Sequence, residues 1–287
     1  MKSAFTLNRH LVQRFGFSLI TLMAVVTVAP IVVVVIYILL QGGPAISWEF
    51  LLSIPRDGMR AGGILPAIVG TFYLTVGTAV FSVPLGIASA IYLSEYAADN
   101  ALTRMIRIAI INLSGIPSVV YGLFGLGLFV LFLKFGTSIL SASLTLSIMT
   151  LPVIISTAEE ALRAVPQSFR TVSVSLGGTR WQTIQRIVLP QALPGILTGV
   201  ILGLERAAGE TAPILFTGAA FFLPRLPNSP LDATMALPYH LFVISTQVPD
   251  MPVKIQYGTA LVLLAFVLTM NLIATVIRSR ARARRQW

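Results

Sequence analysis

The sequence contains no cysteine, only two histidines, and charged side chains at only 10% of its 287 positions. The lack of cysteine excludes disulfides, zinc–thiolate sites and thiol nucleophiles, and two isolated histidines exclude a histidine-rich metal site. Soluble domains carry about 25% charged residues, so this chain has too little charge to coat a water-facing surface. Hydrophobic residues make up 56% of the chain, and the mean hydropathy is +0.88. This composition excludes soluble, disordered and fibrous proteins and indicates a membrane protein.

Six stretches are apolar and long enough to cross a membrane as helices, which takes about 20 residues at ~1.5 Å rise per residue. The predicted spans are Phe15–Leu40, Leu65–Leu93, Ile108–Leu133, Ile139–Ala158, Pro194–Phe222 and Tyr257–Ile277. The sequence therefore predicts an all-α membrane protein with six transmembrane helices and with both termini on the same side.

The distribution of basic residues predicts which side that is. Fourteen lysines and arginines fall in the segments on the side of the termini, against five on the other side, and Arg206 lies within a span. Basic residues are enriched on the cytoplasmic side, so we expect both termini in the cytoplasm. The run Arg278–Arg285 directly follows the last span, which favours contact with anionic membrane lipid over nucleic-acid binding.

The longest predicted inner connection, Glu159–Leu193, is rich in arginine and helical in pattern. Gly177 and Gly178 supply the residues that end a first short helix. Thr179 and Gln182 have the spacing of a capping box, which begins a second helix at once. Two short helices joined at a glycine corner are therefore expected to project from the membrane.

In the second short helix, Trp181, Ile184 and Val188 are spaced on one face, and Pro190 and Pro194 are expected to end the helix before the next span. Two interpretations fit this segment. It is either an amphipathic surface helix in the headgroup layer or a rigid knob that docks into a cytoplasmic partner. The adjacent Glu159 and Glu160 at its start do not face each other on a helix, so paired-carboxylate catalysis is not indicated and they are interpreted as solvated charge.

The spacing in this connection resembles the coupling-loop signature of ABC-importer permeases, which ends Gly-x9-Ile-x-Leu-Pro. The residues that carry the resemblance are Gly177, Ile187, Leu189 and Pro190. Thr171–Ser173 reads Thr-Val-Ser, where the family has Glu-Ala-Ala. None of the three lysines lies in a Gly-x4-Gly-Lys phosphate-binding loop. We therefore expect that the chain is not an enzyme and that it depends on separate ATPase subunits.

The predicted fifth span contains Glu205, Arg206 and Glu210, although charge within a membrane is costly. Arg206 and Glu210 lie four residues apart on one helical face and have the spacing of an ion pair. The pair either fixes helix packing alone or lines a pathway in which the arginine fork attracts an oxyanion. A stripe of glycines at four-residue spacing predicts close approach of another helix: Gly195, Gly199 and Gly203.

Four segments together resemble the PstA-type permeases of phosphate ABC importers. They are Gly115–Gly125, Glu159–Pro166, Gly177–Ile184 and Arg206–Gly218, which contains Gly-Glu-Thr-Ala-Pro. The resemblance implies a type I ABC importer permease fold and transport of inorganic phosphate. It also implies a PstC-type permease, two PstB-type ATPases that use ATP and Mg²⁺, and a PstS-type phosphate-binding protein as partners, with no cofactor bound by this chain.

The same resemblance implies roles for individual residues. Arg206, Glu210 and Thr211 are expected to face the translocation pathway. The residues expected to couple the chain to an ATPase are Gly177, Gly178, Trp181, Ile184, Ile187, Leu189 and Pro190.

The expected organisation has three parts: a transmembrane helix and an outer interfacial segment in residues 1–64, a five-helix permease core in residues 65–277 containing the coupling segment at about 159–193, and a basic cytoplasmic tail in residues 278–287. Other functions remain open at this point. They are import of another oxyanion such as sulfate or molybdate, proton-coupled transport through Glu210, and intramembrane catalysis, for which the chain offers no nucleophile–base or metal constellation.

Overall fold

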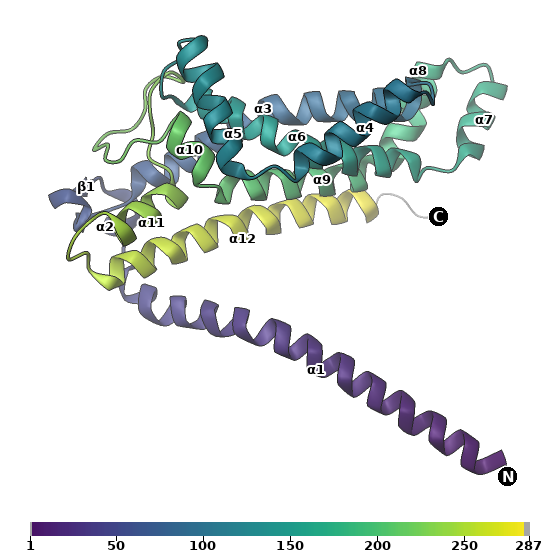
Figure 1. The fold of residues 1–287 in the computed structure, drawn as a ribbon, viewed down its shortest axis with the longest axis horizontal. Helices are drawn as coiled ribbons and strands as arrows, with labels where there is room; N and C mark the ends of the chain where they lie inside the picture. Colours follow the sequence, from purple (N-terminus) through teal and green to yellow (C-terminus); the bar gives the residue numbers. More distant parts are fainter. Residues whose placement is uncertain (1, 284–287) are drawn as a thin grey trace.

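The structure is a computed structural model in which residues 2–283 are described, with side chains over residues 12–280. Twelve α-helices dominate it (Figure 1). They are α1 Lys2–Gly42, α2 Trp48–Leu52, α3 Leu65–Ile91, α4 Ala101–Ser114, α5 Ser118–Gly125, α6 Ile139–Arg163, α7 Gln167–Ser175, α8 Arg180–Thr183, α9 Leu189–Gly209, α10 Ala212–Thr217, α11 Leu237–Thr246 and α12 Val253–Ala283.

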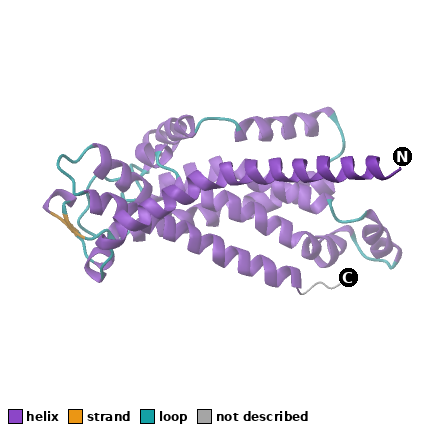
Figure 2. Ribbon diagram, turned by 90° about the horizontal axis from the view of Figure 1, so that it is seen from below, coloured by secondary structure: helices purple, strands orange, loops and turns teal. Residues whose placement is uncertain are grey.

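Shorter elements join these helices. Turns of π-helix extend α3 over Tyr92–Tyr96, extend α5 over Leu126–Phe132, and join α8 to α9 over Ile184–Val188. Two 3₁₀ turns cover Gly43–Ala45 and Asp57–Met59. The two-residue strands β1, Pro55–Arg56, and β2, Ala61–Gly62, pair antiparallel at one end of the molecule, which is otherwise helical (Figure 2).

Five helical segments within the described residues are long and apolar enough to cross a membrane, and the number is six if α4 and α5 form one broken span. The predicted first, second, fourth and sixth spans correspond to α1, α3, α6 and α12. The chain is thus a multi-pass helical membrane protein, as its composition indicates.

The predicted third span, Ile108–Leu133, is not one continuous helix. It is divided into α4 and α5, which are bent by 102° at the break that contains Pro117. Proline has no N–H to donate and disfavours helix in the residue before it, so the chain turns here. The Tyr121 hydroxyl of α5 donates to the Leu113 carbonyl of α4 at 2.7 Å, which holds the two halves across the bend.

The predicted fifth span, Pro194–Phe222, has different limits in the structure. The helix runs without interruption from Arg180 to Gly209, so the prediction that Pro190 and Pro194 end it is wrong. Pro190 lies at the start of α9 directly after the π-helical turn, whose rearranged hydrogen bonds accommodate the missing N–H. The helix ends at Gly209 because the ring of Pro213 would clash with the carbonyl four residues earlier.

Helices α3, α6 and α9 form the tightly packed centre of the bundle. A Cβ atom built on Gly199 of α9 would lie 2.7 Å from Cβ of Thr157 in α6, and one built on Gly86 of α3 would lie 2.6 Å from Cγ2 of Ile154. The Ser147 hydroxyl of α6 also donates to the Thr78 carbonyl of α3 at 3.1 Å. Small residues and interhelical hydrogen bonds drive helix packing in membranes. The predicted close approach along the α9 glycine stripe is confirmed.

Helix α1 contacts the bundle near its C-terminal end and then diverges from α12 along its length (Figure 1). Gly42 fits against the backbone of Tyr257 and Gly258, and the rings of Tyr37 and Tyr257 meet edge to face with centroids 5.4 Å apart. The apolar side chains of its membrane-length stretch are exposed. This surface is therefore open to lipid or to another transmembrane subunit.

Two ends of the bundle differ in chemistry. We call the end that carries α7 and α8 the basic end, and the end that carries α2, β1 and α11 the opposite end (Figure 1). His240 of α11, one of the two isolated histidines, is only 2% exposed because it packs into the core at the opposite end. Helix α12 runs from the opposite end to Ala283, and the last part of the predicted basic tail, residues 284–287, lies outside the described residues.

Candidate translocation and coupling sites

The break between α9 and α10 brings Arg206 and Glu210 together. Arg206 lies in the last turn of α9, and Glu210 follows its end with extended backbone angles, φ −75° and ψ 141°. The Nε atom of Arg206 is 3.4 Å from Oε1 of Glu210. The predicted pair therefore exists, but the carboxylate belongs to a helix break and not to a continuous helical face.

This pair leaves most of the arginine available. Charge-assisted bonds are usually 2.7–2.9 Å long, so 3.4 Å is a loose contact. Within the described part of the chain, the two Nη atoms of Arg206 make no hydrogen bond, and 36% of the side chain is exposed. A planar fork of free donors beside a helix break is suited to a tetrahedral oxyanion.

The second broken helix lies beside the first. Gly122 of α5 packs directly on Ala212, Pro213 and Phe216 of α10, leaving no room for a side chain at position 122. Broken helices at membrane depth are tolerated where they are buried in protein or line a cavity. The second halves of the two broken helices thus pack on each other. Thr211, half-buried at the start of α10, adds a hydroxyl to the turn that follows Arg206.

Glu205 differs from its neighbours. Its Oε1 atom is buried and has no hydrogen-bond partner within the described residues. The sequence singles it out as an intramembrane acid, and the structure assigns it no ion-pair partner.

The coupling segment has the predicted local geometry. Gly177 has φ +83°, the left-handed conformation that ends α7, and the capping box is formed by Thr179 and Gln182 through their side chains and backbone N–H groups. The result is a helix, a glycine corner and a second helix at the basic end.

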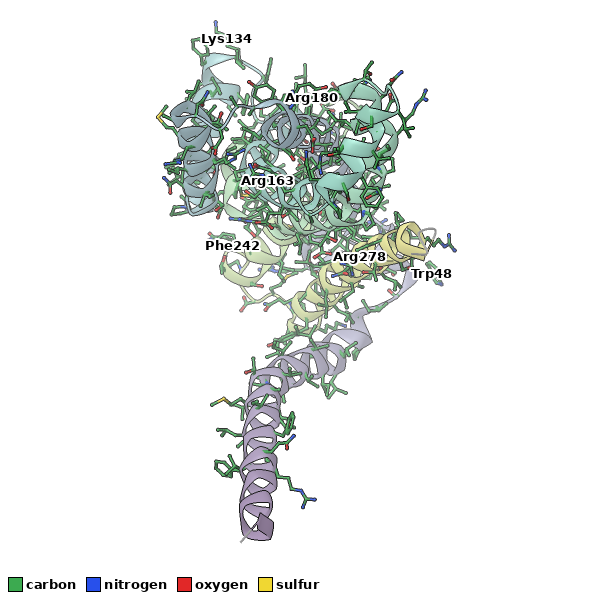
Figure 3. All side chains as sticks on the ribbon, turned by 90° about the vertical axis from the view of Figure 1, so that its right-hand side faces the viewer. Trp48, Lys134, Arg163, Arg180, Phe242 and Arg278 are labelled. Atoms are coloured by element: carbon green, nitrogen blue, oxygen red, sulfur yellow. The ribbon has the colours of Figure 1, made fainter. Side chains whose placement is uncertain are left out.

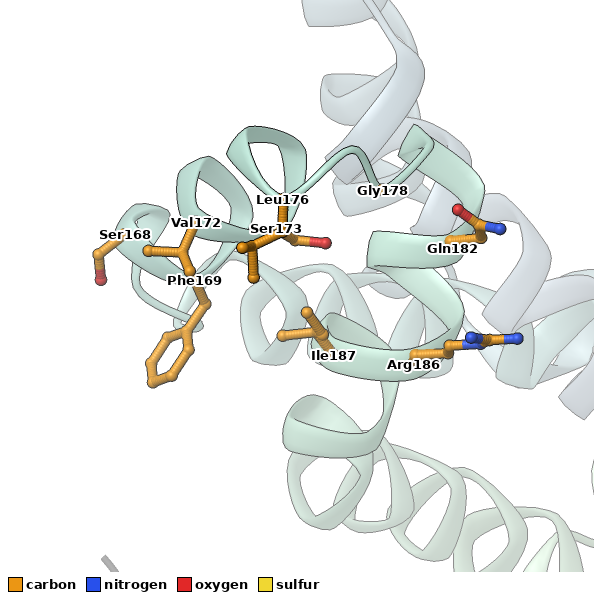
Figure 4. A pocket seen from close by; sticks show the side chains of 9 residues that line it. All are labelled: Ser168, Phe169, Val172, Ser173, Leu176, Gly178, Gln182, Arg186 and Ile187. Carbon is orange, nitrogen blue, oxygen red and sulfur yellow. The ribbon is translucent and has the colours of Figure 1, made fainter.

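A groove of about 420 Å³ runs between these two helices (Figure 4). Its apolar lining comes from Phe169, Val172 and Leu176 of the first helix and from Ile187 of the turn after α8. Gly178 closes one end of it (Figure 4). Residues Val172, Val174, Leu176 and Trp181 are also exposed large hydrophobic side chains, which form an apolar surface next to the groove.

The other predicted coupling residues are divided by this arrangement. Ile184 and Val188 are buried against the bundle, whereas Trp181 is 55% exposed, so the three do not share one buried face. Leu189 and Pro190 are half-buried where the segment joins α9. The segment thus has an anchored side and a free side.

Glu159 is not solvated charge. Its Oε1 atom lies 2.8 Å from Nε of Arg107 in α4 and 2.9 Å from Nη2 of Arg163 one turn later. Arg107 also donates to the Leu93 carbonyl at 2.8 Å. The interpretation of Glu159 as solvated was wrong, because its partner comes from a distant helix; Glu160 is exposed as expected.

A second ion pair at the basic end joins Glu95 to Arg170 of α7. The two residues form a forked contact, with Nη2–Oε1 at 2.7 Å and Nε–Oε2 at 3.1 Å. Figure 3 looks onto this end, where Arg163 and Arg180 are labelled. No local pattern in the sequence points to Glu95 or Arg170 as a pair, because the two residues are 75 positions apart.

A family model and named relatives agree on the family to which this chain is similar. Residues 82–285 match the model of the family described as binding-protein-dependent transport system inner membrane component. The chain is 33% identical over 282 residues to the probable ABC transporter permease protein YqgI of Bacillus subtilis, covering 93% of this chain and 95% of the relative. It is also 33% identical over 286 residues to phosphate transport system permease protein PstA 1 of Mycobacterium tuberculosis, covering 98% and 92% of the two chains.

Solved structures share the fold. A bacterial ABC transporter involved in import of the acidic polysaccharide alginate aligns with a TM-score of 0.67 at 12% identity, over 96% of this chain and 99% of that one. The MetNI methionine ABC transporter in an inward-facing conformation aligns with a TM-score of 0.60 at 16% identity, over 76% and 97%. The predicted ABC importer permease fold is confirmed, and the chain belongs to the family of binding-protein-dependent transport system inner membrane components.

Proposed function

We propose that this chain is the transmembrane permease subunit of an ATP-driven importer of inorganic phosphate. The observation that carries the proposal is the partly exposed Arg206 guanidinium, whose Nη atoms have no protein partner in the described residues and which stands at the break between α9 and α10. Relatives of nearly full length are named phosphate transport system permease proteins. A fixed cation within the membrane lowers the barrier for an anion, and the loosely held Glu210 limits how tightly the anion binds.

Arg206, Glu210 and Thr211 line the pathway in this proposal. The arginine offers its free fork to the phosphate oxygens, and the Thr211 hydroxyl adds a further donor. A PstC-type permease completes the pathway, and a PstS-type binding protein delivers phosphate at the opposite end. Conduction requires that the anion be released as well as captured. The Glu210 carboxylate competes with the anion for Arg206 and so favours release.

The α7–α8 segment is the contact with the ATPase. Its exposed Trp181 and Leu176 and the groove beside Ile187 form an apolar docking surface, while buried Ile184 anchors the segment to the bundle. Gly177, Gly178, Leu189 and Pro190 set its shape. Two PstB-type ATPases bind and hydrolyse ATP with Mg²⁺, and this chain binds no cofactor of its own.

The basic end faces the cytoplasm in this proposal, with both termini on that side of a bacterial inner membrane. Residues 1–64 form a peripheral transmembrane helix and outer segment, residues 65–277 the permease core, and residues 278–287 a basic tail at anionic lipid.

The test is phosphate uptake into proteoliposomes that contain this chain with its PstC-, PstB- and PstS-type partners. We expect uptake that requires ATP and the binding protein and that excess sulfate or molybdate does not suppress. Suppression by sulfate or molybdate would reassign the substrate to another oxyanion. Uptake by this chain alone, driven by a proton gradient and indifferent to ATP, would replace the proposal with a secondary carrier based on Glu210.

A further inference from the structure

The basic end of α3 is held by residues from three other helices. Glu95 lies in the π-helical turn that extends α3, and only 8% of it is exposed. Its two carboxylate oxygens accept from Nη2 and Nε of Arg170 at 2.7 and 3.1 Å. This forked geometry is the strongest ion pairing that an arginine makes, and it fixes orientation as well as distance.

Arg170 reaches a third helix with the same guanidinium. Its Nη1 atom donates to the Val165 carbonyl at 2.6 Å, and Nη2 donates to the Leu162 carbonyl at 2.9 Å. These carbonyls belong to the end of α6 and the turn that follows it, where a positive charge is favoured by the helix dipole. One side chain of α7 therefore joins the ends of α3 and α6.

The second helix of the coupling segment, α8, also contacts the end of the extended α3. Arg180, the first residue of α8, donates through Nη2 to the backbone carbonyl of Glu95. Its guanidinium carbon also lies 5.0 Å from the centroid of the Tyr96 ring, within the range of a cation–π contact. Both helices of the segment thus bind Glu95 near the end of the extended α3, and α8 also contacts Tyr96.

The other end of α3 is fastened as well. The Thr71 hydroxyl accepts a hydrogen bond from the Leu237 N–H at the start of α11, at 2.8 Å. Gly70 packs against the Met235 backbone so closely that a side chain would not fit. Thr71 and Glu95 are 24 positions apart along the helix, which is about 36 Å along the axis. Helix α3 therefore connects the coupling segment with the opposite end of the bundle.

We infer that Glu95 is a positioning residue of the transport cycle. Through Arg170 and Arg180 it fastens the α7–α8 segment to α3, so that a movement imposed on the segment at the basic end moves α3 and, with it, the contact at α11. Without this junction, the segment would remain joined to the bundle by the turn after α6 and by the continuous helix from α8 into α9, and its movement would not be carried to α3. The inference rests on the proposed function, in that partner ATPases are what move the segment.

The junction also gives the departure at Thr171–Ser173 a structural context. The segment lacks the glutamate of the Glu-Ala-Ala pattern, and in this chain the acid that binds the segment comes from α3 instead. The connection to the bundle is therefore made within the chain, by residues 75 positions apart.

The first experiment compares Glu95→Gln with Glu160→Gln in the complete reconstituted transporter. Glu160 is an exposed carboxylate at the same end with no side-chain partner in the described residues, so it is a matched control. We expect Glu95→Gln to lower phosphate transported per ATP hydrolysed by at least about fivefold, the lower end of usual coupling effects, with equal yield of assembled complex. Glu160→Gln is expected to behave as the unaltered protein.

The double variant tests whether the effect of Glu95 on transport per ATP is exerted through Arg170 and is not a general loss of folding. If Glu95 acts through Arg170, then adding Glu95→Gln to Arg170→Gln lowers transport per ATP little further than Arg170→Gln alone, because Arg170→Gln has already removed the interaction that the two residues share. The inference is overturned if Glu95→Gln leaves transport per ATP unchanged. It is also overturned if uptake falls only in proportion to the amount of assembled complex.

A second experiment uses the absence of cysteine, which allows spin labels at two chosen positions of the complex. Labels at Phe72→Cys on α3 and Gln167→Cys on α7 occupy exposed positions outside the proposed docking surface. We expect one narrow distance distribution that nucleotide trapping does not change, and a broadened, nucleotide-dependent one when Glu95→Gln is added. A nucleotide-dependent distance in the otherwise unaltered protein would overturn the inference. This readout needs no phosphate, so failure of phosphate transport alone would refute the proposed function and leave the inference standing.

Discussion

Arg107 of α4 and Glu159 of α6 stand 52 positions apart in the sequence and 2.8 Å apart in the structure, measured from Nε to Oε1. The contact joins the first half of the broken span to the central helix of the bundle. The same arginine donates to the Leu93 carbonyl at the end of α3, so three helices meet at one guanidinium. The position of α4 at the basic end therefore depends on this ion pair as well as on apolar packing.

Replacing Glu159 by glutamine is expected to destabilise the protein by about 2 kcal/mol, below the ~3–5 kcal/mol for breaking a fully buried pair, because Arg107 is partly exposed. The variant leaves Arg107 without its anionic partner. Thermal unfolding of the detergent-solubilised protein measures the effect as a lower midpoint. The neighbouring Glu160→Gln is the control and is expected to change stability by less than about 0.5 kcal/mol. Equal midpoints for the two variants would show that the ion pair contributes nothing.

Hydropathy predicts the spans because the apolar requirement is local to each helix. The breaks were harder to predict, although Pro117 and Pro213 mark both of them. A proline indicates that a helix is disturbed, whereas the 102° bend between α4 and α5 depends on tertiary contacts such as that of Tyr121 with Leu113. The turn at Gly177 was predictable because glycine conformation and capping act within a few residues.

The ion pairs at the basic end show the limit of sequence reasoning. Arg206 and Glu210 were predicted as a pair because they are four residues apart. Glu95 pairs with an arginine 75 positions away, and Glu159 with one that is 52 positions away. Such pairs form only once the helices are assembled, and a single sequence carries no local sign of them. Glu159 also pairs with Arg163 four residues on, and that spacing was a local sign that its interpretation as solvated charge did not use.

Arg206→Gln is expected to lower phosphate uptake at least about tenfold, equal to ~1.4 kcal/mol, at unchanged assembly. The variant removes the cation beside the α9–α10 break, and with it the attraction for an anion. Arg206→Lys keeps the charge without the planar fork and is expected to give intermediate uptake. Uptake assays in proteoliposomes check this, with the exposed Arg225→Gln at the opposite end as control. Full uptake by Arg206→Gln would assign the pair to packing alone.

Gly199→Ala is expected to destabilise the bundle by about 1–3 kcal/mol. The added methyl group would lie 2.7 Å from Cβ of Thr157, so α9 and α6 must move apart. Gly127→Ala provides a control of opposite sign. Its Cβ meets no atom within 4 Å, and alanine restricts the unfolded chain, so stability is expected to rise by up to ~1 kcal/mol. A thermal midpoint of Gly199→Ala equal to or above that of the unaltered protein would contradict close packing at Gly199.

His240 is expected to make stability depend on pH. It lies in α11, outside the candidate spans, and its burial lowers its pKa to about 4 from the usual 6.5. Between these values the unfolded chain binds a proton that the folded chain does not, so folding stability is fully present above pH 6.5 and declines as pH falls towards 4. The expected loss is up to ~3 kcal/mol across this window, from 1.36 kcal/mol per pKa unit.

Thermal midpoints of the unaltered protein and of His240→Leu between pH 4 and 8 isolate this contribution, because the carboxylates titrate equally in both proteins. Leucine fits an apolar site in which the histidine Nδ1 atom has no hydrogen-bond partner. The difference between the two midpoints is therefore expected to shift in favour of His240→Leu as the pH falls below 6.5, and to stay constant above it. A difference that is constant over the whole range would mean that His240 reaches water when it is protonated, which its burial at the opposite end argues against.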